Sequence, residues 1–273
     1  MINMSDAVPF TEALDLNRFG GKSVQLGAAL RAGLPVPPGH ALSVALVDRL
    51  MAGDGEAKAQ VEHLFTGLSS ACAVRSSAVG EDGANASFAG QHATILNVRS
   101  SPELIPAIAA VWRSGRSESA LAYRRKIGII GEPRVAVALQ RLIEPESAGV
   151  LFTRNPITGA DERVIEATWG LGEAVVAGLV TPDHFRVGCD GEILERIIGN
   201  KDLEIKADPA GGTRELAVDD ARASACCLTD GQLAKLHELA SRCQRAFGTA
   251  LDLEWAFAGG ELYLLQSRAI TAS

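Results

Sequence analysis

The sequence predicts an α+β protein built from two lobes. Hydrophobic residues recur at helical intervals in much of the first half, whereas short β-rich runs separated by turn residues dominate the second half. Because helices and hairpins are segregated along the chain rather than alternating, the pattern favours an α+β over an α/β architecture. We expect lobes at 1–134 and 135–273, with a ligand-binding cleft between them.

The first half contains most of the predicted helices. Hydrophobic spacing predicts helices at 22–32, 43–51, 56–68 and 117–127. A further helix is predicted after Ser100, with Ser101 as its N-cap and Pro102 at its first helical position. Strands are predicted at 71–76 and 92–98. The glycine-rich segment 77–90 between them predicts a loop whose backbone can approach a ligand closely.

The second half predicts sheets joined by tight turns. Short β-rich runs lie at 135–143, 149–153 and 163–168. Asp190-Gly191 predicts a hairpin turn between 184–189 and 192–198, because both central positions of that turn need positive φ. Thr229 and Gln232 form the capping box of a helix that ends at Gly248. A closing hairpin, 251–257 and 261–266, is predicted around Gly259-Gly260.

Composition narrows the class of protein. The chain has 26 Lys+Arg against 33 Asp+Glu, a net charge of -7, which argues against a nucleic-acid-binding surface. It has no apolar run of membrane-spanning length, and residues 1–20 lack the apolar segment of a secretory signal, so we expect a cytoplasmic protein without a membrane partner. The five cysteines include no C-x-x-C pair, so neither a disulfide framework nor a zinc site is expected.

Gly20-Gly21-Lys22-Ser23 is the first candidate phosphate-binding motif. It is not a P-loop, because the first glycine of that loop would fall at Leu16 and no buried strand precedes it. A Lys at the start of a helix is nevertheless well placed for an anion, since free N–H groups and the helix dipole favour negative charge there. The alternative is a solvated Lys in a glycine turn.

Arg75 is the second candidate. It lies at the end of an apolar strand beside the glycine-rich loop, where its planar set of donors could bind a phosphate bidentately. Ala71, Ala73 and Arg75 share one face of that strand, which argues against a freely solvated Arg. A structural salt bridge remains the alternative.

The segment Trp169-Gly170-Leu171-Gly172-Glu173 contains two of the three glycines of a dinucleotide-binding fingerprint. The third would fall at position 175, which is not glycine, so a Rossmann site is rejected. The segment is more simply a glycine-rich turn after a strand. Glu173 is either a charge at a helix start or a ligand contact.

The closing hairpin carries a polar face. Asp252 and Glu254 alternate with large apolar residues, and Gln266 and Arg268 share a face of the partner strand. If the connecting loop spans an odd number of residues, Glu254, Gln266 and Arg268 gather on one side. A carboxylate and an amide oxygen beside an Arg can hold Mg²⁺ and a triphosphate. The alternative is a solvated polar face.

The order of these motifs resembles the nucleotide-binding domain, of the two-lobed ATP-grasp fold, in the phosphoenolpyruvate synthase, pyruvate phosphate dikinase and rifampin phosphotransferase family. The resemblance spans nearly the whole chain. Its motifs are Gly20–Lys22 with Ala32–Gly39, Ala73–Ser77 with Ala86–Gln91, Gly149–Thr153 with Asn155-Pro156, Trp169–Glu173 with Val180–Asp183, and Asp252–Trp255 with Leu265–Arg268.

The resemblance implies a role for each candidate residue. It implies that Lys22, Arg75 and Arg268 bind ATP phosphates in catalysis and that Gly90 and Thr94 belong to the loop and strand covering them. It places Gln140 beside the adenine, and it gives Glu254 and Gln266 to Mg²⁺. The chain departs from the family at Ala269, where Pro is usual. None of its histidines has the glycine-rich sequence context of the family's phosphate-carrying histidine.

The first hypothesis is therefore an ATP-Mg²⁺-dependent phosphotransferase subunit. It would transfer a phosphoryl or pyrophosphoryl group to a histidine on a separate carrier protein. One alternative is a self-sufficient kinase for a small molecule, and another is a non-catalytic, nucleotide-binding regulatory module. The presence of Lys22, Arg75, Glu254, Gln266 and Arg268 together argues against the regulatory module.

Overall fold

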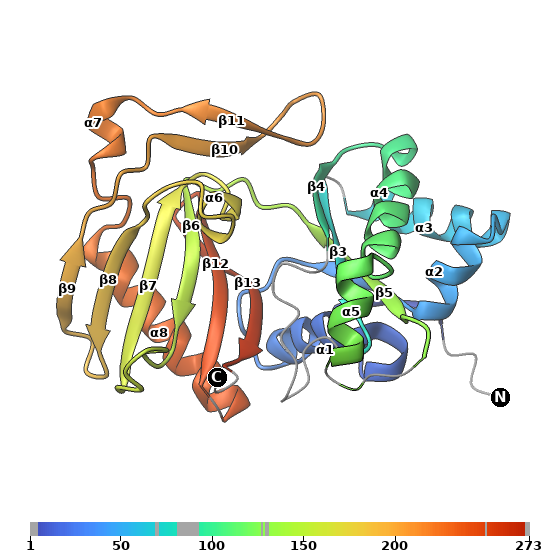
Figure 1. The fold of residues 1–273 in the computed structure, drawn as a ribbon, viewed down its shortest axis with the longest axis horizontal. Helices are drawn as coiled ribbons and strands as arrows, with labels where there is room; N and C mark the ends of the chain where they lie inside the picture. The colour runs from blue at the N-terminus through green and yellow to red at the C-terminus, as the bar shows by residue number, and fades with distance from the viewer. Residues whose placement is uncertain are drawn as a thin grey trace.

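Two lobes lie side by side, each built on an antiparallel sheet (Figure 1). The computed structural model describes residues 5–68, 71–80, 93–126, 128, 131–248 and 250–270. The first sheet has the order β1-β2-β5-β3-β4, and the second has the order β13-β12-β6-β7-β8-β9. This confirms the α+β, two-lobed prediction. Within the described residues, no helix is both long and apolar enough to cross a membrane.

The first lobe places most of its helices against one sheet. Its strands are β1 (Ala7–Pro9), β2 (Gly39–Leu42), β3 (Cys72–Ala78), β4 (Thr94–Val98) and β5 (Val135–Arg141). Its helices are the 3₁₀ helix η1 (Phe10–Glu12), α1 (Leu16–Arg31), α2 (Val44–Met51), α3 (Gly55–Gly67), α4 (Ser101–Ser114) and α5 (Glu118–Lys126). Buried residues of α2, α3 and α4 form one core with the strands of this sheet.

The second lobe packs one long helix behind its sheet. Its strands are β6 (Ser147–Phe152), β7 (Glu162–Trp169), β8 (Asp183–Gly188), β9 (Ile193–Ile197), β12 (Leu251–Ala258) and β13 (Glu261–Ala269). The separate hairpin consists of β10 (Leu203–Ala207) and β11 (Thr213–Ala217), and the helices are α6 (Glu173–Val176), α7 (Asp220–Ala223) and α8 (Asp230–Phe247). The capping box at Thr229 and Gln232 is present as predicted.

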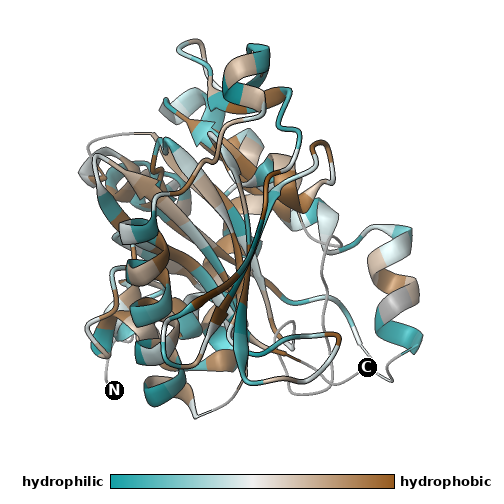
Figure 2. Cartoon of the chain, turned by 90° about the vertical axis from the view of Figure 1, so that its left-hand side faces the viewer, coloured by the Kyte–Doolittle hydropathy of each residue, from teal (hydrophilic) through white to brown (hydrophobic). Residues whose placement is uncertain are grey.

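Helix α1 belongs to the core of the second lobe as well as to the first. Phe19 and Leu26 of α1 are buried in the same hydrophobic cluster as Leu236 of α8 and Trp255 of β12. Helices and strands alike carry both hydrophobic and hydrophilic residues (Figure 2). The lobes therefore share a core in addition to the chain that links them.

Strand β5 lies in the first sheet, where it pairs with β2 and β3. The boundary expected from the sequence, between residues 134 and 135, instead assigned this strand to the second lobe. Its β-rich sequence resembles the hairpins that follow, and only its long-range pairing reveals where it belongs. We propose that the lobe boundary lies in the connection from β5 to β6, at residues 142–146.

Several elements differ from their predicted limits. β3 runs to Ala78, so Arg75 lies within the strand rather than at its end, and Ser77 is a strand residue rather than part of the loop. The N-cap of α4 is Ser100 rather than Ser101. Strand β2 and the hairpin β10–β11 were not predicted from their short sequences. β2 pairs with β5, which is distant in the chain, whereas β10 and β11 pair with each other.

The hairpin β10–β11 reaches from the second lobe to the first, above the space between the lobes (Figure 1). Asn97 of β4 is fully buried and has φ 57°. Its amide nitrogen donates to the carbonyl oxygens of Asp208 and Gly212, at 2.7 and 2.6 Å, in the turn of the hairpin. A short polar side chain tolerates this left-handed conformation, and here it fastens the hairpin to the opposite lobe.

Asp183, which lies in one of the motifs that resemble the family, forms a buried ion pair in the second lobe. Its carboxylate and the ammonium of Lys201 are fully buried and lie 2.5 Å apart. The carboxylate also accepts from the backbone N–H groups of Gly199 and Cys227, at 2.9 and 2.7 Å. Because each charge is paired and hydrogen-bonded, this buried pair fixes the connections around β8 and before α8.

Gly20 interrupts α1 and allows β3 to approach closely. Its φ of 71° and ψ of 172° are outside the helical region and are almost restricted to glycine. A Cβ atom at this position would lie 1.7 Å from the carbonyl oxygen of Ser77. The glycine is thus required by both backbone conformation and space.

Gly20→Ala is expected to lower the free energy of unfolding by more than about 4 kcal/mol, because strain and a backbone overlap act together. Gly33→Ala is the matched control, since Gly33 also has positive φ but a Cβ atom there would meet no neighbouring atom within 4 Å. That variant should lose about 1 kcal/mol. Urea unfolding measures both changes, and equal losses would contradict this account of Gly20.

Candidate functional site

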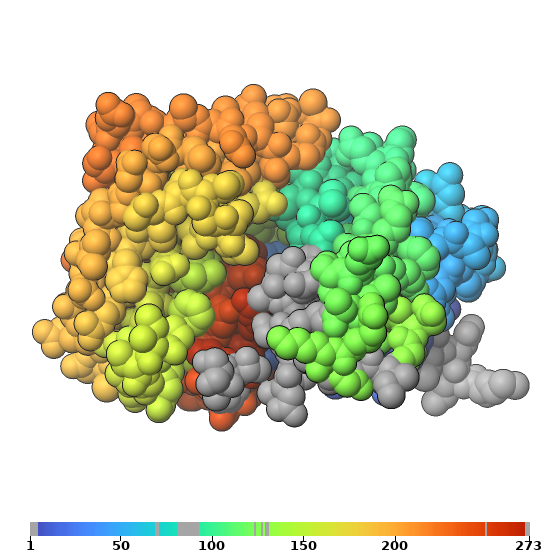
Figure 3. Space-filling model, in the orientation of Figure 1, coloured from blue at the N-terminus to red at the C-terminus, as the bar shows by residue number. Residues whose placement is uncertain are grey.

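A cavity of about 590 Å³ lies between the lobes. In the space-filling view, the C-terminal strands are visible in the depression between the two lobes (Figure 3). The cavity is within the size range of small-molecule sites. Its lining includes the candidate residues Lys22, Arg75, Thr94, Gln140, Glu254, Gln266 and Arg268. Gly90, the remaining candidate, lies outside the described residues.

Lys22 enters the cavity wall from the start of the regular part of α1. The Oγ of Ser77 accepts from the backbone N–H of Ser23 at 2.9 Å and donates to the carbonyl oxygen of Phe19 at 2.6 Å. Strand β3 therefore caps the helix just after its interruption at Gly20. Lys22 is largely buried, with 7% of its surface exposed, which argues against the solvated alternative.

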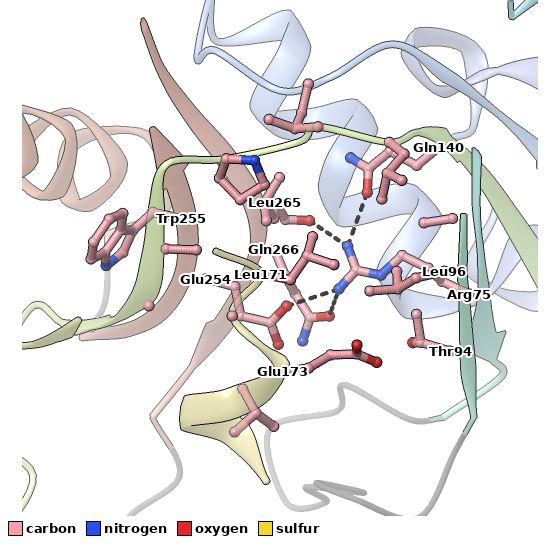
Figure 4. Close-up of a pocket in the computed structure, with 18 of the residues that line it drawn as sticks. Arg75, Thr94, Leu96, Gln140, Leu171, Glu173, Glu254, Trp255, Leu265 and Gln266 are labelled. Atoms are coloured by element: carbon pink, nitrogen blue, oxygen red, sulfur yellow. Dashed lines mark hydrogen bonds and ion pairs between the residues drawn. The ribbon is translucent and has the colours of Figure 1, made fainter. Parts of the chain in front are cut away.

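Arg75 connects the two lobes across the cavity (Figure 4). Its Nη1 donates to Gln140 Oε1 at 2.9 Å and to the carbonyl oxygen of Leu265 at 2.6 Å. Its Nη2 donates to Glu254 Oε2 at 2.9 Å and to Gln266 Oε1 at 2.8 Å. The structural ion pair, one of the two interpretations of the sequence, is thus present, and it occupies the same cavity as the other candidates.

A β-bulge creates the polar face of the closing hairpin. The turn at Gly259-Gly260 has two residues rather than an odd number, so the sequence-based condition for gathering the polar residues is not met. The register shifts by one residue next to Glu254, which places Glu254 opposite Gln266 and Asp252 opposite Arg268. The bulge therefore brings together the residues that the turn alone would have separated.

Glu254 and Gln266 provide oxygen atoms that suit a hard cation. Both oxygens lie within 2.9 Å of the same nitrogen of Arg75, so they converge on a position of positive charge. No group of three His, Cys, Asp or Glu side chains suited to a metal occurs in the described part of the chain. Mg²⁺ commonly takes one or two protein oxygens and completes its shell with phosphate and water oxygens. The pair fits such a shared site.

Gln140 occupies the wall of the cavity at the end of β5. It is 2% exposed, and its Oε1 is held by Arg75. Its Nε2 has no hydrogen-bond partner in the part of the chain that the structure describes. Buried amide donors are normally satisfied, so this nitrogen indicates a position for an acceptor on a bound molecule.

An apolar wall faces these polar groups and was not predicted as part of the site. Leu96, Leu142 and Leu171 line the cavity and belong to a small cluster that joins both lobes and the hairpin β10–β11. Leu96 lies two residues after Thr94, so strand alternation could have placed it on the same face. Leu142, in the connection between the lobes, carries no local signal for a site.

Glu173 also lines the cavity, at the start of α6 (Figure 4). Burial raises the pKa of Glu173, and a hydrogen bond with Thr213 of β11 acts in the opposite direction. The sequence left two interpretations of Glu173, a charge at a helix start or a ligand contact. Its position in the cavity wall is consistent with the ligand contact. The neighbouring glycines let this turn approach closely, since a Cβ at Gly170 would lie 2.4 Å from the carbonyl oxygen of Ile205.

The sequence of this chain is similar to those of known proteins. The model of the pyruvate phosphate dikinase AMP/ATP-binding domain matches residues 56–273. The prodigiosin synthesizing transferase PigC of Serratia marcescens is 37% identical over 95% of this chain and 32% of its own length. A probable phosphoenolpyruvate synthase of Methanothermobacter thermautotrophicus is 33% identical over 97% of this chain and 46% of its own length.

A rifampicin phosphotransferase of Streptomyces sviceus is 42% identical over 76% of this chain and 24% of its own length. This chain therefore spans less than half the length of each of these relatives. Among solved structures, a D-alanine–D-alanine ligase from Bacillus anthracis complexed with ATP aligns at a TM-score of 0.41 and 10% identity, over 96% of this chain and 58% of its own.

Arg75→Ala is expected to lower the free energy of unfolding by about 3 kcal/mol, because it leaves Glu254 and two amide oxygens without their shared donor. The control is Arg196→Ala, which removes an exposed ion pair with Asp230 and should cost less than about 1 kcal/mol. Urea unfolding measures both. A loss at Arg75 no larger than that of the control would show that the contact between the lobes adds little stability.

Proposed function

Because the chain belongs to the family of the pyruvate phosphate dikinase AMP/ATP-binding domain, we propose that it binds ATP-Mg²⁺ in the cavity between its lobes and activates it for transfer. The proposed reaction passes a phosphoryl or pyrophosphoryl group from ATP to a histidine on a separate carrier protein. The observation that carries the proposal is that three basic side chains, a convergent oxygen pair and an apolar wall from both lobes line one cavity.

Lys22, Arg75 and Arg268 are the proposed phosphate-binding residues. Phosphoryl transfer needs little covalent chemistry from the protein, so catalysis depends on holding the transferred group in line and on neutralising its charge. Arg75 and Arg268 can each offer planar donors to phosphate oxygens, and Lys22 adds a cation near a helix start. Thr94, opposite Arg75 in the register of β3 and β4, borders the same end of the cavity.

Glu254 and Gln266 would hold Mg²⁺, which when bound supplies positive charge to the phosphate oxygens. With the ion bound, Arg75 would donate to the phosphates of the nucleotide instead of to these two oxygens. Each charge would stay paired, the carboxylate with the ion and the guanidinium with the phosphates. The apolar wall, with the unpartnered amide nitrogen of Gln140, is the proposed place of the adenine.

The acceptor histidine is proposed to lie outside this sequence. No histidine lines the cavity within the described residues. Two of the relatives are named as a phosphoenolpyruvate synthase and a rifampicin phosphotransferase, and this chain spans less than half of either. These observations support a division in which this domain activates ATP and a histidine outside the described cavity receives the group; we propose that this histidine lies on a separate carrier protein.

Binding is tested by calorimetric titration with a non-hydrolysable ATP analogue. The native chain is expected to bind it with a dependence on Mg²⁺, and Glu254→Ala should weaken binding at least about tenfold in the presence of Mg²⁺ because it removes a metal oxygen. In the absence of the metal this variant should bind no more weakly than native, because Arg75 no longer has to leave the Glu254 carboxylate to reach the phosphates. Asp230→Ala, an exposed acid on α8, is the control. Failure of the native chain to bind would refute the proposed nucleotide site.

The rate of ATP turnover distinguishes the carrier hypothesis from the hypothesis of a self-sufficient kinase. The chain alone is expected to convert ATP slowly, because no histidine lines the cavity in the part of the chain that the structure describes. Addition of a cell extract should raise the release of ADP or AMP and should label a protein with acid-labile phosphate, as a phosphohistidine requires. Rapid phosphorylation of a small molecule by the purified chain would favour the self-sufficient kinase instead.

A further inference from the structure

Asp252 forms the second cross-strand pair produced by the bulge in the closing hairpin. It lies on β12 opposite Arg268 of β13, next to the pair formed by Glu254 and Gln266 on the same face. Arg268 lines the cavity between the lobes, whereas Asp252 is 9% exposed and lies behind it. The acid therefore reaches the cavity only through its Arg partner.

The contact between these two side chains is short and uses one edge of the guanidinium. Asp252 Oδ2 accepts a hydrogen bond from Nε of Arg268 at 2.7 Å and forms an ion pair with Nη2 of the same guanidinium at 2.6 Å. A carboxylate oxygen close to two nitrogens of one rigid fork restrains the plane of the guanidinium as well as its position. Asp252 thus determines how Arg268 is presented to the cavity.

The second oxygen of Asp252 makes this pair unfavourable as a purely stabilising contact. Oδ1 is buried and has no hydrogen-bond partner among the described residues. Burial raises the pKa of Asp252, and the charge of Arg268 opposes that change. A buried ion pair with one unsatisfied oxygen adds little stability compared with an apolar pair of similar size. Its place directly behind a cavity-lining Arg points to a role in positioning.

We propose that Asp252 is a positioning residue that holds the guanidinium of Arg268 toward the terminal phosphate of the bound nucleotide. This inference rests on the proposed function and adds to it a residue that makes no contact with the nucleotide. Displacement of a positioned group by about 1 Å can cost a hundredfold in rate, so an acid behind the cavity can control the site. Arg268 performs the contact, and Asp252 fixes its geometry.

The test compares a non-hydrolysable ATP analogue with ADP, which lacks the terminal phosphate. We define the phosphate preference as the ratio of the two dissociation constants, measured by calorimetry with Mg²⁺. Asp252→Asn keeps the shape of the side chain and removes its charge, and it is expected to reduce this preference at least fivefold while affinity for ADP changes less than twofold. If the role of Asp252 were purely structural, Asp252→Asn would weaken the binding of both ligands to a similar extent.

A double-mutant cycle tests whether Asp252 acts through Arg268. Arg268→Met should reduce the phosphate preference, and adding Asp252→Asn to it should cause no further reduction, because the group that Asp252 orients is gone. Glu204→Gln is the matched control. Glu204 is 4% exposed and makes a two-bond ion pair with Arg222, at 2.8 and 2.9 Å, outside the cavity. This control should leave the phosphate preference unchanged.

The outcomes distinguish the inference from the function on which it rests. If the native chain binds neither ligand, the proposed function fails. If the native chain binds both and Asp252→Asn keeps the native preference, or reduces it equally in the Arg268→Met background, the positioning role is refuted. Asp252→Ser provides a second, smaller replacement, and urea unfolding checks both variants. Failure of both to fold would show that Asp252 is required for structure and would also overturn the proposal.

Discussion

Arg75 donates hydrogen bonds to four acceptors across the cavity, and the arrangement of the site depends on this one guanidinium. Its acceptors come from β5 in the first lobe and from β12 and β13 in the second. The buried cation balances the carboxylate of Glu254 and directs two side-chain amides at once. This guanidinium therefore keeps the carboxylate of Glu254 and the amide oxygens of Gln140 and Gln266 paired at the cavity wall.

Signals that act over a few residues were sufficient for much of the fold. The capping box of α8 and its left-handed Gly248, with φ 68°, are local features and were predicted as observed. Alternation along single strands identified Arg75 and Glu254, because a charged residue within an apolar strand stands out from its neighbours. The order of the motifs along the chain then assigned these residues to a nucleotide site. Residue spacing alone did not make that assignment.

The remaining features depend on contacts between distant parts of the chain. A two-residue turn without the bulge would have paired Glu254 with Leu265, so only the bulged register aligns the polar residues. The place of β5 is decided by its pairing with β2 and β3, and the hairpin β10–β11 is fastened by Asn97 of the opposite lobe. The partner of Arg268 was likewise hidden, since Asp252 has the same alternation as Glu254.

The position of α1 has a consequence for how the chain folds during synthesis. Gln25 of α1 bonds Ser267 of β13 at 3.2 Å, and Pro35 accepts from the backbone N–H of Leu264 at 2.9 Å. The apolar face of α1 thus emerges from the ribosome long before the strands that cover it. Contacts of such large sequence separation form slowly and leave hydrophobic surface exposed in the meantime. Until β12 and β13 have been synthesised, this face of α1 lacks the strands that cover it in the folded protein.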